Sequence, residues 1–408
     1  MQLHDCHWPN PDVVDMHVVF PDPRADPERA GSYDFLRTDE YLRAIVAIRS
    51  GIVYRLGESI EHHKVKKYVH PPKDPARFAA ASLGIIRHYN DGWANGHKYG
   101  IRYWEIWNEP ENQPAMWTGT DEEYFRLYST TAKAIKARYP DLRVGGPALG
   151  NTGELKGDTL TPSPFFRRFL DHCRTDAAPL DFFSWHCYTN DPGELARRAR
   201  AVRRLLDDAG FRKTESHLNE WNYLPDGDWM PMLSPDGSRR QRWNERVNGA
   251  EGAAFVAAGL IALQDAPLDA ANYFTADVQT IGLFDGAGVS RKNFHAFRAF
   301  RSLTDTPRRV AINGKLPAGM FAGAGVDAKS KTVTLLLSKM AGPAQQVTVR
   351  LAGLPQGRME YDVLRLTDRH DLTRAEAGST ASHQLPALTL TAPAVYLFTV
   401  RVPADRNE

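Results

Sequence analysis

From residue 38 to residue 303, short apolar runs alternate with segments of helical length, and this alternation limits the possible folds of the 408-residue chain most strongly. Strands that alternate with helices of ten or more residues indicate parallel βαβ units. The predicted strands are almost continuously apolar, as in a sheet covered on both faces. Strands are predicted at 51–59, 101–107, 142–149, 180–188, 214–222 and 268–277, and helices at 38–50, 74–92, 121–138, 163–175, 193–209, 247–264 and 291–303.

Beyond residue 305 the helical pattern ends, and short runs rich in β-branched and aromatic residues are separated by Gly, Pro, Asp and Asn. These runs lie at 333–339, 345–351, 359–366, 388–392 and 394–402. Short strands without intervening helices predict a small antiparallel β-sandwich. We therefore predict an α/β chain with a (β/α)8 TIM-type barrel over residues 1–305 and a β-sandwich accessory domain over residues 306–408.

Composition argues against several kinds of partner. The 51 Lys and Arg residues nearly balance the 49 Asp and Glu residues, so the charge gives no reason to expect nucleic acid or a membrane surface. No apolar run is long enough to span a bilayer, and the N-terminus lacks a signal-peptide pattern, which leaves the localisation unknown. Cys6, Cys173 and Cys187 lack metal-ligand spacing and are expected to be free thiols. We expect no metal and no other cofactor.

The stretch IRYWEIWNEPEN at 101–112 begins as an aromatic, apolar strand and stops abruptly at Asn108-Glu109-Pro110. Pro110 cannot donate to a sheet and biases Glu109 away from the helical conformation. A carboxylate is thus placed at the carboxyl end of a strand, which is the catalytic face of a parallel barrel. The alternative interpretation is a solvated acid in an ordinary turn.

A second glutamate has the same setting. Glu220 ends the apolar run of HLNEWN at 217–222, again among Asn and Trp residues. The separation from Glu109 holds three βα units, so both strand ends should lie at one barrel mouth. Two carboxylates across an aromatic-lined cleft suit glycoside hydrolysis, in which one is protonated and the other is ionised.

Several motifs make the chain resemble glycoside hydrolase family 39, the β-xylosidase and α-L-iduronidase family of the large clan of retaining (β/α)8 glycosidases. The matching motifs are WEIWNEPEN at 104–112, RVGGPAL at 143–149, SWHCYTN at 184–190, LNEWN at 218–222 and YFTADV…IGLFD within 273–285. The resemblance covers roughly residues 1–305, and a β-sandwich is a usual companion of the barrel.

This resemblance implies roles for individual residues. Glu109 would be the general acid/base and Glu220 the nucleophile of a double-displacement mechanism. Asn108 would hold the 2-hydroxyl of the sugar, and His186 and Tyr188 would line the sugar-binding site. Further candidates for contact with the substrate are Trp117, Trp221 and Asn222, although the two tryptophans could belong to the core.

Two positions depart from the family pattern. His4 matches the His of an Arg-x-His strand end, but Gln2 replaces the Arg. Glu58 stands where family xylosidases carry an aromatic residue beside the bound sugar, and we include it among the residues expected to contact substrate. These departures concern the identity of the sugar and leave the chemistry intact.

The N-terminal residues lead to a prediction about closure of the barrel. If residues 2–5 end the family's second strand, the first βα unit lies upstream of Met1. Seven barrel-type strands would then leave an exposed edge between residues 2–5 and residues 269–275. The apolar run at 13–20 is expected to be an excursion from the barrel mouth, and its presence in the barrel wall would contradict this expectation.

We expect a retaining glycoside hydrolase whose partner is an oligo- or polysaccharide. Alternatives on the same fold are an inverting hydrolase and a transglycosylase. A non-catalytic carbohydrate-binding barrel is the alternative from another class, and the presence of both carboxylates argues against it. The sugar, the linkage, the exo or endo mode and the oligomeric state stay open.

Overall fold

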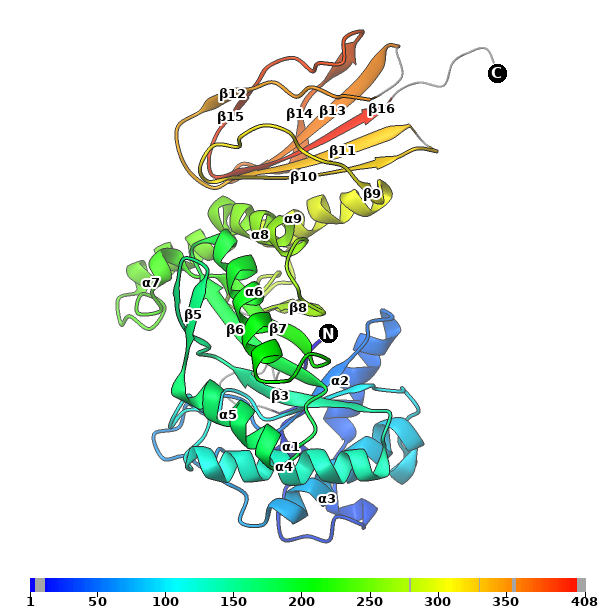
Figure 1. The fold of residues 1–408 in the computed structure, drawn as a ribbon, viewed down its shortest axis with the longest axis vertical. Helices are drawn as coiled ribbons and strands as arrows, with labels where there is room; N and C mark the ends of the chain where they lie inside the picture. The colour runs from blue at the N-terminus through cyan, green and yellow to red at the C-terminus, as the bar shows by residue number, and fades with distance from the viewer. Residues whose placement is uncertain (4–11, 279, 330, 354–356, 402–408) are drawn as a thin grey trace. The chain divides into compact units, whose positions relative to one another are not determined.

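The computed structural model describes residues 1–3, 12–278, 280–329, 331–353 and 357–401. The chain forms two compact units (Figure 1), each assembled from several segments. The first unit comprises Met1–Cys187, Arg198–Trp221 and Pro267–Tyr273, and the second comprises Tyr188–Arg197, Asn222–Ala266 and Phe274–Glu408. The domain boundary at residue 305 stays a prediction.

A six-stranded sheet has the order β1-β2-β3-β6-β7-β8. The pairs β1–β2, β2–β3, β3–β6 and β7–β8 are parallel, and a parallel bridge adds Gln2 beside Val53. The strands are β1 (Val53–Leu56), β2 (Tyr103–Ile106), β3 (Arg143–Leu149), β6 (Phe182–Thr189), β7 (Glu215–Tyr223) and β8 (Ala270–Tyr273). These strands and the bridge coincide with the seven barrel-type strands predicted from the sequence.

Helices follow the strands as predicted (Figure 1). They are α2 (Leu36–Ala47), α3 (Pro75–Ile86), α4 (Asp121–Arg138), α5 (Pro164–Thr175) and α6 (Pro192–Asp208). The start of α4 is a capping box, in which the side chains of Thr120 and Glu123 satisfy each other's backbone N–H groups. The helix packs on β2, where the Tyr124 hydroxyl donates to the carbonyl of Ile106 at 3.0 Å.

Side-chain contacts show that this sheet is curled. Strands lie about 4.8 Å apart in a sheet, so β1 and β7, four positions apart, would be about 19 Å apart if the sheet were flat. Yet Arg55 Nη2 on β1 lies 3.4 Å from Glu220 Oε1 on β7. Asn219 on β7 likewise donates to Glu105 on β2 at 2.7 Å. The sheet therefore has the curvature of a TIM-like fold, with these polar side chains on its inner face.

The parallel strands do not form a closed ring among the described residues. Among the described residues, no strand pairing joins β8 to the bridge at Gln2. The run at 13–20 is outside the wall, because its central residues form the short helix α1 (Met16–Val19). Helix α2 begins after Phe35, and the hydroxyl of Thr38 in its first turn accepts from Val14 N at 3.0 Å.

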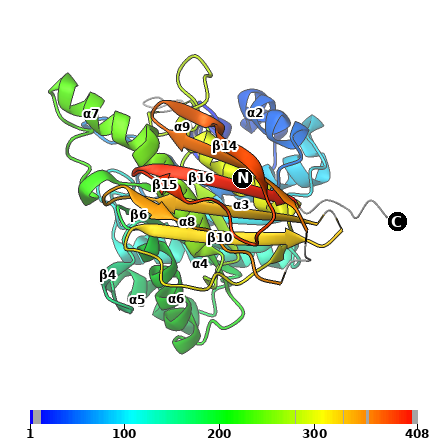
Figure 2. The same ribbon diagram turned by 90° about the horizontal axis from the view of Figure 1, so that it is seen from above.

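The second unit contains antiparallel sheets, as predicted (Figure 2). A six-stranded sheet has the order β14-β13-β16-β11-β10-β9, and a two-stranded sheet pairs β12 with β15. The strands are β9 (Arg308–Arg309), β10 (Met320–Asp327), β11 (Thr332–Lys339), β12 (Gln345–Val347), β13 (Met359–Thr367), β14 (His370–Thr380), β15 (Leu388–Leu390) and β16 (Ala394–Arg401). Apolar residues from both sheets form one cluster, including Leu337, Phe398, Leu390 and Val347. This arrangement fits a β-sandwich.

Three helices belong to the same unit: α7 (Gly237–Asn248), α8 (Ala250–Leu263) and α9 (Lys292–Arg301). The sequence predicted one helix over 247–264, but Gly249 has an extended conformation there and separates α7 from α8. A Cβ at Gly249 would lie only 2.5 Å from the carbonyl oxygen of Glu245, so this junction requires glycine. Ser338 on β11 donates to the Ala254 carbonyl on α8 at 2.6 Å.

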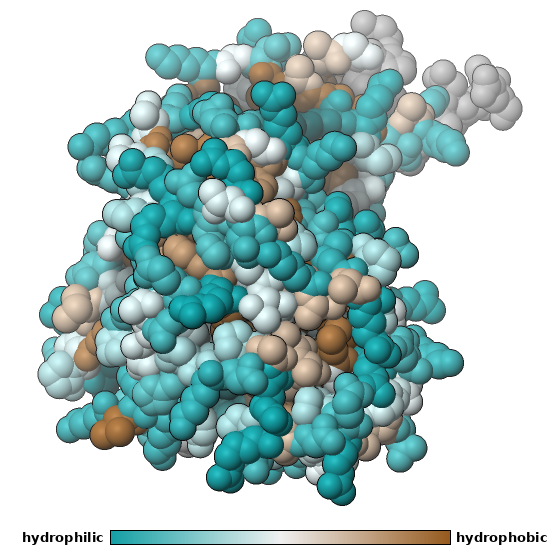
Figure 3. Space-filling view, turned by 60° about the horizontal axis from the view of Figure 1, so that its bottom comes forward, coloured by the Kyte–Doolittle hydropathy of each residue, from teal (hydrophilic) through white to brown (hydrophobic). Residues whose placement is uncertain are grey.

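The surface view in Figure 3 is mostly hydrophilic, with hydrophobic residues in small separate groups. Exposed large apolar side chains include Leu36, Ile48 and Val65. Isolated residues of this kind are normal on a protein surface. In the described part of the chain, none of the helices combines the length and apolar character needed to cross a membrane.

Candidate active site

The turn after β2 has an unusual backbone that presents Glu109. Trp107 and Glu109 have φ angles of 69° and 44°, in the left-handed region that residues other than glycine rarely adopt. Backbone hydrogen bonds hold the turn: Trp107 N donates to Leu56 O at 2.9 Å, and Glu109 N donates to Ala148 O at 3.1 Å. Backbone strain of this kind is concentrated at functional sites.

Glu109, His186 and Glu220 meet at the carboxyl ends of β2, β6 and β7. His186 Nδ1 lies 2.6 Å from Glu109 Oε1 and 3.5 Å from Glu220 Oε2. One ligand atom from each residue lies within 4.8 Å of those from the other two, so an oxygen of each carboxylate is within that distance of the other. The side chains of Glu109, His186 and Glu220 are 18%, 0% and 6% exposed. The sequence predicted all three residues, and the structure brings them together.

The charges of this trio are coupled. Burial alone would lower the pKa of His186, but the charge of Glu220 and the hydrogen bond to Glu109 raise that pKa to about 9. Burial opposes the ionised form of Glu109, but the hydrogen bond and charge of His186 hold the pKa of Glu109 below its usual value. At neutral pH the proton of the hydrogen bond between His186 and Glu109 therefore lies on His186, and Glu109 is ionised.

Arg55 and Glu105 lie beneath the trio and were not predicted as site residues. Arg55 is 2% exposed and donates to Glu220 Oε1 at 3.4 Å. On its other side, Arg55 Nε lies 3.7 Å from Glu105 Oε2, and the buried Glu105 also accepts from Gln2 and Asn219. Buried charges must be paired to be tolerated. A charged residue within an otherwise apolar strand was the available sequence signal for both residues.

Asn108 lies in the same turn as Glu109 and is 3% exposed. Its Oδ1 atom is buried and has no hydrogen-bond partner among the described residues. An unpaired buried carbonyl is costly, and this cost is relieved when a ligand supplies a donor. The position therefore suits contact with a sugar hydroxyl.

Glu58 is held by protein groups and not presented as a free carboxylate. Its Oε1 accepts from His17 N at 3.0 Å, and the His17 ring contacts Oε2 and stacks on Tyr68. Asp15 accepts from the backbone and hydroxyl of Ser59 at 2.8 Å. Burial raises the pKa of Glu58 and that of Asp15 well above their usual values.

The other predicted residues are placed as follows. Trp117 is fully buried against Trp107 and donates to Thr120 O, so it packs in the core and has no face open to a sugar. Trp221 is 1% exposed and packs edge-on against Tyr273. His4 lies outside the described residues.

Two predicted residues fall within the second unit. Tyr188 is partly exposed and lies edge-on against Trp229, with ring centroids 5.0 Å apart. Asn222 donates to the carbonyl oxygens of Phe274 and Ile281, so its amide holds the backbone that follows β8. Cys173 and Cys187 are both buried, Cys173 as the free thiol that was predicted, and Cys6 lies outside the described residues.

Comparison with known proteins bears directly on this site. Residues 23–312 match the sequence model of the glycosyl hydrolases family 39. The chain belongs to glycosyl hydrolase family 39. The resemblance seen in the sequence motifs is thereby confirmed, and the two glutamates lie in the matched region.

Two relatives named beta-xylosidase share this similarity. The protein from Caldicellulosiruptor saccharolyticus is 29% identical over 257 residues, which is 58% of this chain and 44% of the relative. The protein from Geobacillus stearothermophilus is 31% identical over 182 residues, which is 38% of this chain and 33% of the relative. The matches thus span less than half the length of either relative.

Solved structures share the fold. A glucosidase from Croceicoccus marinus has a TM-score of 0.76 at 24% identity, over 96% of this chain and 88% of that chain. A monomeric beta-xylosidase from Caulobacter crescentus CB15 has a TM-score of 0.66 at 18% identity, over 91% of this chain and 85% of that chain. At these identities, the likeness shows the fold alone.

The raised pKa of His186 predicts how stability depends on pH. The folded-state pKa of about 9 exceeds the usual value of 6.5, so the stabilisation is complete below pH 6.5 and disappears as the pH rises through 9. We expect a loss of up to about 3 kcal/mol across this window. Urea unfolding of the wild type and His186→Asn at pH 6 and pH 9.5 measures the difference.

His172 provides the control for this measurement, because burial lowers its pKa. His172→Asn should therefore leave the wild-type loss between pH 6 and pH 9.5 in place, whereas His186→Asn should remove it. An equal pH dependence in the wild type and His186→Asn would contradict the assignment.

Proposed function

We propose that the chain is a retaining glycoside hydrolase that cleaves O-glycosidic bonds in oligo- or polysaccharides, with Glu109 as acid/base and Glu220 as nucleophile. One observation carries the proposal: an oxygen of each carboxylate lies within 4.8 Å of the other. Retaining enzymes hold their carboxyl groups about 5–5.5 Å apart, whereas inverting enzymes need about 6.5–9.5 Å to admit a water molecule. The curled parallel sheet that carries both residues is proposed to belong to a (β/α)8 barrel.

The proton held by His186 is the one used in the first chemical step. When it moves from His186 Nδ1 to Glu109 Oε1, Glu109 becomes a neutral acid, His186 becomes neutral, and Glu220 stays ionised. Glu109 then protonates the leaving oxygen while Glu220 attacks the anomeric carbon and forms a glycosyl ester. In the second step, Glu109 takes a proton from the water that hydrolyses this ester. The return of that proton from Glu109 to His186 restores the starting protonation state.

The buried residues around the trio position the nucleophile and the sugar. Arg55 donates to Glu220 Oε1, which fixes that carboxylate and leaves its other oxygen directed toward His186. Asn108, with its unpaired Oδ1, would accept a hydrogen bond from the 2-hydroxyl of the sugar, an interaction that strengthens in the transition state. Glu58 is proposed to contribute a polar wall at the position where family xylosidases carry an aromatic residue.

A panel of aryl glycosides tests this proposal, and it includes β-xylosides and glucosides, the substrates suggested by the names of the similar proteins. Proton NMR of the first-formed product should show the anomer of the substrate, before mutarotation mixes the two forms. An inverted first product would rule out the nucleophilic role of Glu220. Sugar binding without hydrolysis of any glycoside would instead support a non-catalytic carbohydrate-binding protein.

A further inference from the structure

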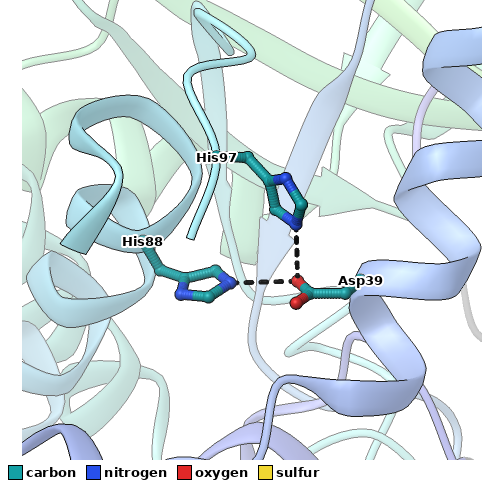
Figure 4. Close-up of side chains that lie close together, drawn as sticks. All are labelled: Asp39, His88 and His97. Atoms are coloured by element: carbon teal, nitrogen blue, oxygen red, sulfur yellow. Dashed lines mark hydrogen bonds and ion pairs between the residues drawn. The ribbon is translucent and has the colours of Figure 1, made fainter. Parts of the chain in front are cut away.

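A second cluster of potential ligands lies in the first unit, separate from the two catalytic glutamates. Asp39 lies in the first turn of α2, His88 lies in a π-helical segment that continues α3 over Arg87–Asp91, and His97 lies in the following loop. Both histidines direct Nε2 at the same carboxylate oxygen, Asp39 Oδ1 (Figure 4). The distances are 3.0 Å for His88 and 3.4 Å for His97.

The hydrogen bond on the far side of His88 decides its protonation. His88 Nδ1 lies 3.0 Å from the carbonyl oxygen of Trp93, which can only accept, so Nδ1 carries a proton. In the neutral ring, Nε2 is then the atom that carries the lone pair, and this is the form in which histidine binds a metal ion. His88 Nε2 lies 3.0 Å from Asp39 Oδ1, a contact short enough to be a hydrogen bond when Nε2 is protonated. A cation among these atoms would interact favourably with both the lone pair and the carboxylate.

His97 adds an independent observation. Its Nε2 atom is buried and makes no hydrogen bond with any described residue. A metal-bound histidine commonly donates its other ring N–H to a backbone carbonyl, and His88 already has this second bond.

The cluster is rigidly built. The ring of Phe35 stacks on His88 with centroids 3.6 Å apart, and Tyr99 stacks on His97 at 4.5 Å. His97 N donates to His88 O at 2.7 Å, which ties the loop to the π-helical segment. A Cβ at Gly96 would lie 2.6 Å from His88 Nδ1, so only glycine lets the loop pass this closely. Segments of π-helix occur frequently at functional sites.

We propose that Asp39, His88 and His97 bind one zinc-like divalent transition-metal ion. Bonds of 2.0–2.1 Å at a tetrahedral centre place ligand atoms about 3.3 Å apart, close to the two distances from Asp39 Oδ1. The side chains of Asp39 and His97 are 19% and 23% exposed, which leaves a solvent-facing position for water as the fourth ligand. Two imidazoles and a carboxylate favour zinc or cobalt over Mg²⁺ and Ca²⁺, which prefer oxygen ligands.

The ion would connect three segments that are separate in the sequence: the start of α2, the π-helical segment and the loop that carries His97. Because the ligands are assembled only in the folded state, binding would stabilise the fold. This site was not predicted from the sequence, because Asp39 is distant from the two histidines along the chain. The proposal does not depend on the glycosidase assignment.

The test uses the full chain after treatment with EDTA. Calorimetric titration with Zn²⁺ should show one bound ion, and thermal unfolding should shift to higher temperature on addition of Zn²⁺ but not of Mg²⁺ or Ca²⁺. Co²⁺ should give the visible absorption bands of a tetrahedral site. His97→Ala should weaken Zn²⁺ binding by at least about 100-fold and abolish the thermal shift.

Three further variants make the outcome decisive. His97→Cys should retain Zn²⁺ binding, because a thiolate is also a ligand, and this separates the loss of a ligand from a folding defect. His172 lies 3.9 Å from Asp176, but this pair is not joined by a second histidine among the described residues. The His172→Ala variant should therefore bind Zn²⁺ like the wild type. Glu109→Gln should also bind normally. Absence of Zn²⁺ binding by the wild type, unchanged binding by His97→Ala, or loss of binding in Glu109→Gln would overturn the proposal.

Discussion

Glu220→Ala should lower the hydrolysis of every aryl glycoside by at least about 10⁴-fold, which corresponds to about 5.5 kcal/mol of transition-state stabilisation. Without the carboxylate, the glycosyl ester cannot form, and no other described carboxylate is paired with both Arg55 and His186. Added azide should enter the vacated space and attack the anomeric carbon directly. Turnover should recover, and NMR should identify a glycosyl azide of inverted configuration.

Glu215→Gln is the matched control, because Glu215 lies at the opposite end of β7 and pairs with Arg143 and His217. Loss of this negative charge should reduce stability but leave the turnover number of the folded protein unchanged. Substantial hydrolysis by Glu220→Ala without azide would show that another group is the nucleophile. Formation of the retained glycosyl azide would instead assign Glu220 the acid/base role.

The parallel strands could be predicted because their burial on both faces requires continuous apolar runs, as in Phe182–Thr189. Among the strands of the sandwich that escaped prediction, β10 and β14 did so for opposite reasons. Small residues and glycines fill β10 (MFAGAGVD), which weakens its propensity to form a strand. Polar residues fill β14 (HDLTRAEAGST), which lies at the sheet edge and is exposed along most of its length. Pairing with neighbouring strands, which the local sequence does not encode, stabilises both.

The glutamates at the strand ends were predictable because the barrel geometry gathers such ends together. The curvature that brings Arg55 to Glu220 could not be predicted in the same way. A sequence shows which strand carries a charged residue, but it does not show which distant strand that residue faces. For Trp117, the sequence could not distinguish a role in substrate binding from a role in the core. An aromatic residue in a loop after a strand suits either sugar stacking or packing, and here Trp117 is fully buried, with Trp107 and Tyr124 packed edge-on against it.

Glu109→Ala should give a loss of activity that depends on the leaving group. A leaving group with a low pKa departs without protonation, so dinitrophenyl glycosides should lose no more than about tenfold in the rate of the first step. Alkyl glycosides and oligosaccharides require a proton on the leaving oxygen, and their rates should fall by about 10²–10⁴-fold. A plot of log kcat/KM against leaving-group pKa should therefore be much steeper for the variant than for the wild type.

Glu111 makes this test sharper, because it is a second acid two residues away in the same turn. Burial, together with the charge of Glu109, raises the pKa of Glu111 to about 7, so Glu111 is partly protonated near neutral pH. Its Oε1 accepts from Asn151 N at 2.9 Å, and its Oε2 is buried without a hydrogen-bond partner among the described residues. Glu109, unlike Glu111, contacts His186, which holds the proton used in the first step. Glu111→Gln should therefore keep the shallow wild-type slope, and a steep slope in Glu111→Gln with a shallow one in Glu109→Ala would transfer the acid role to Glu111.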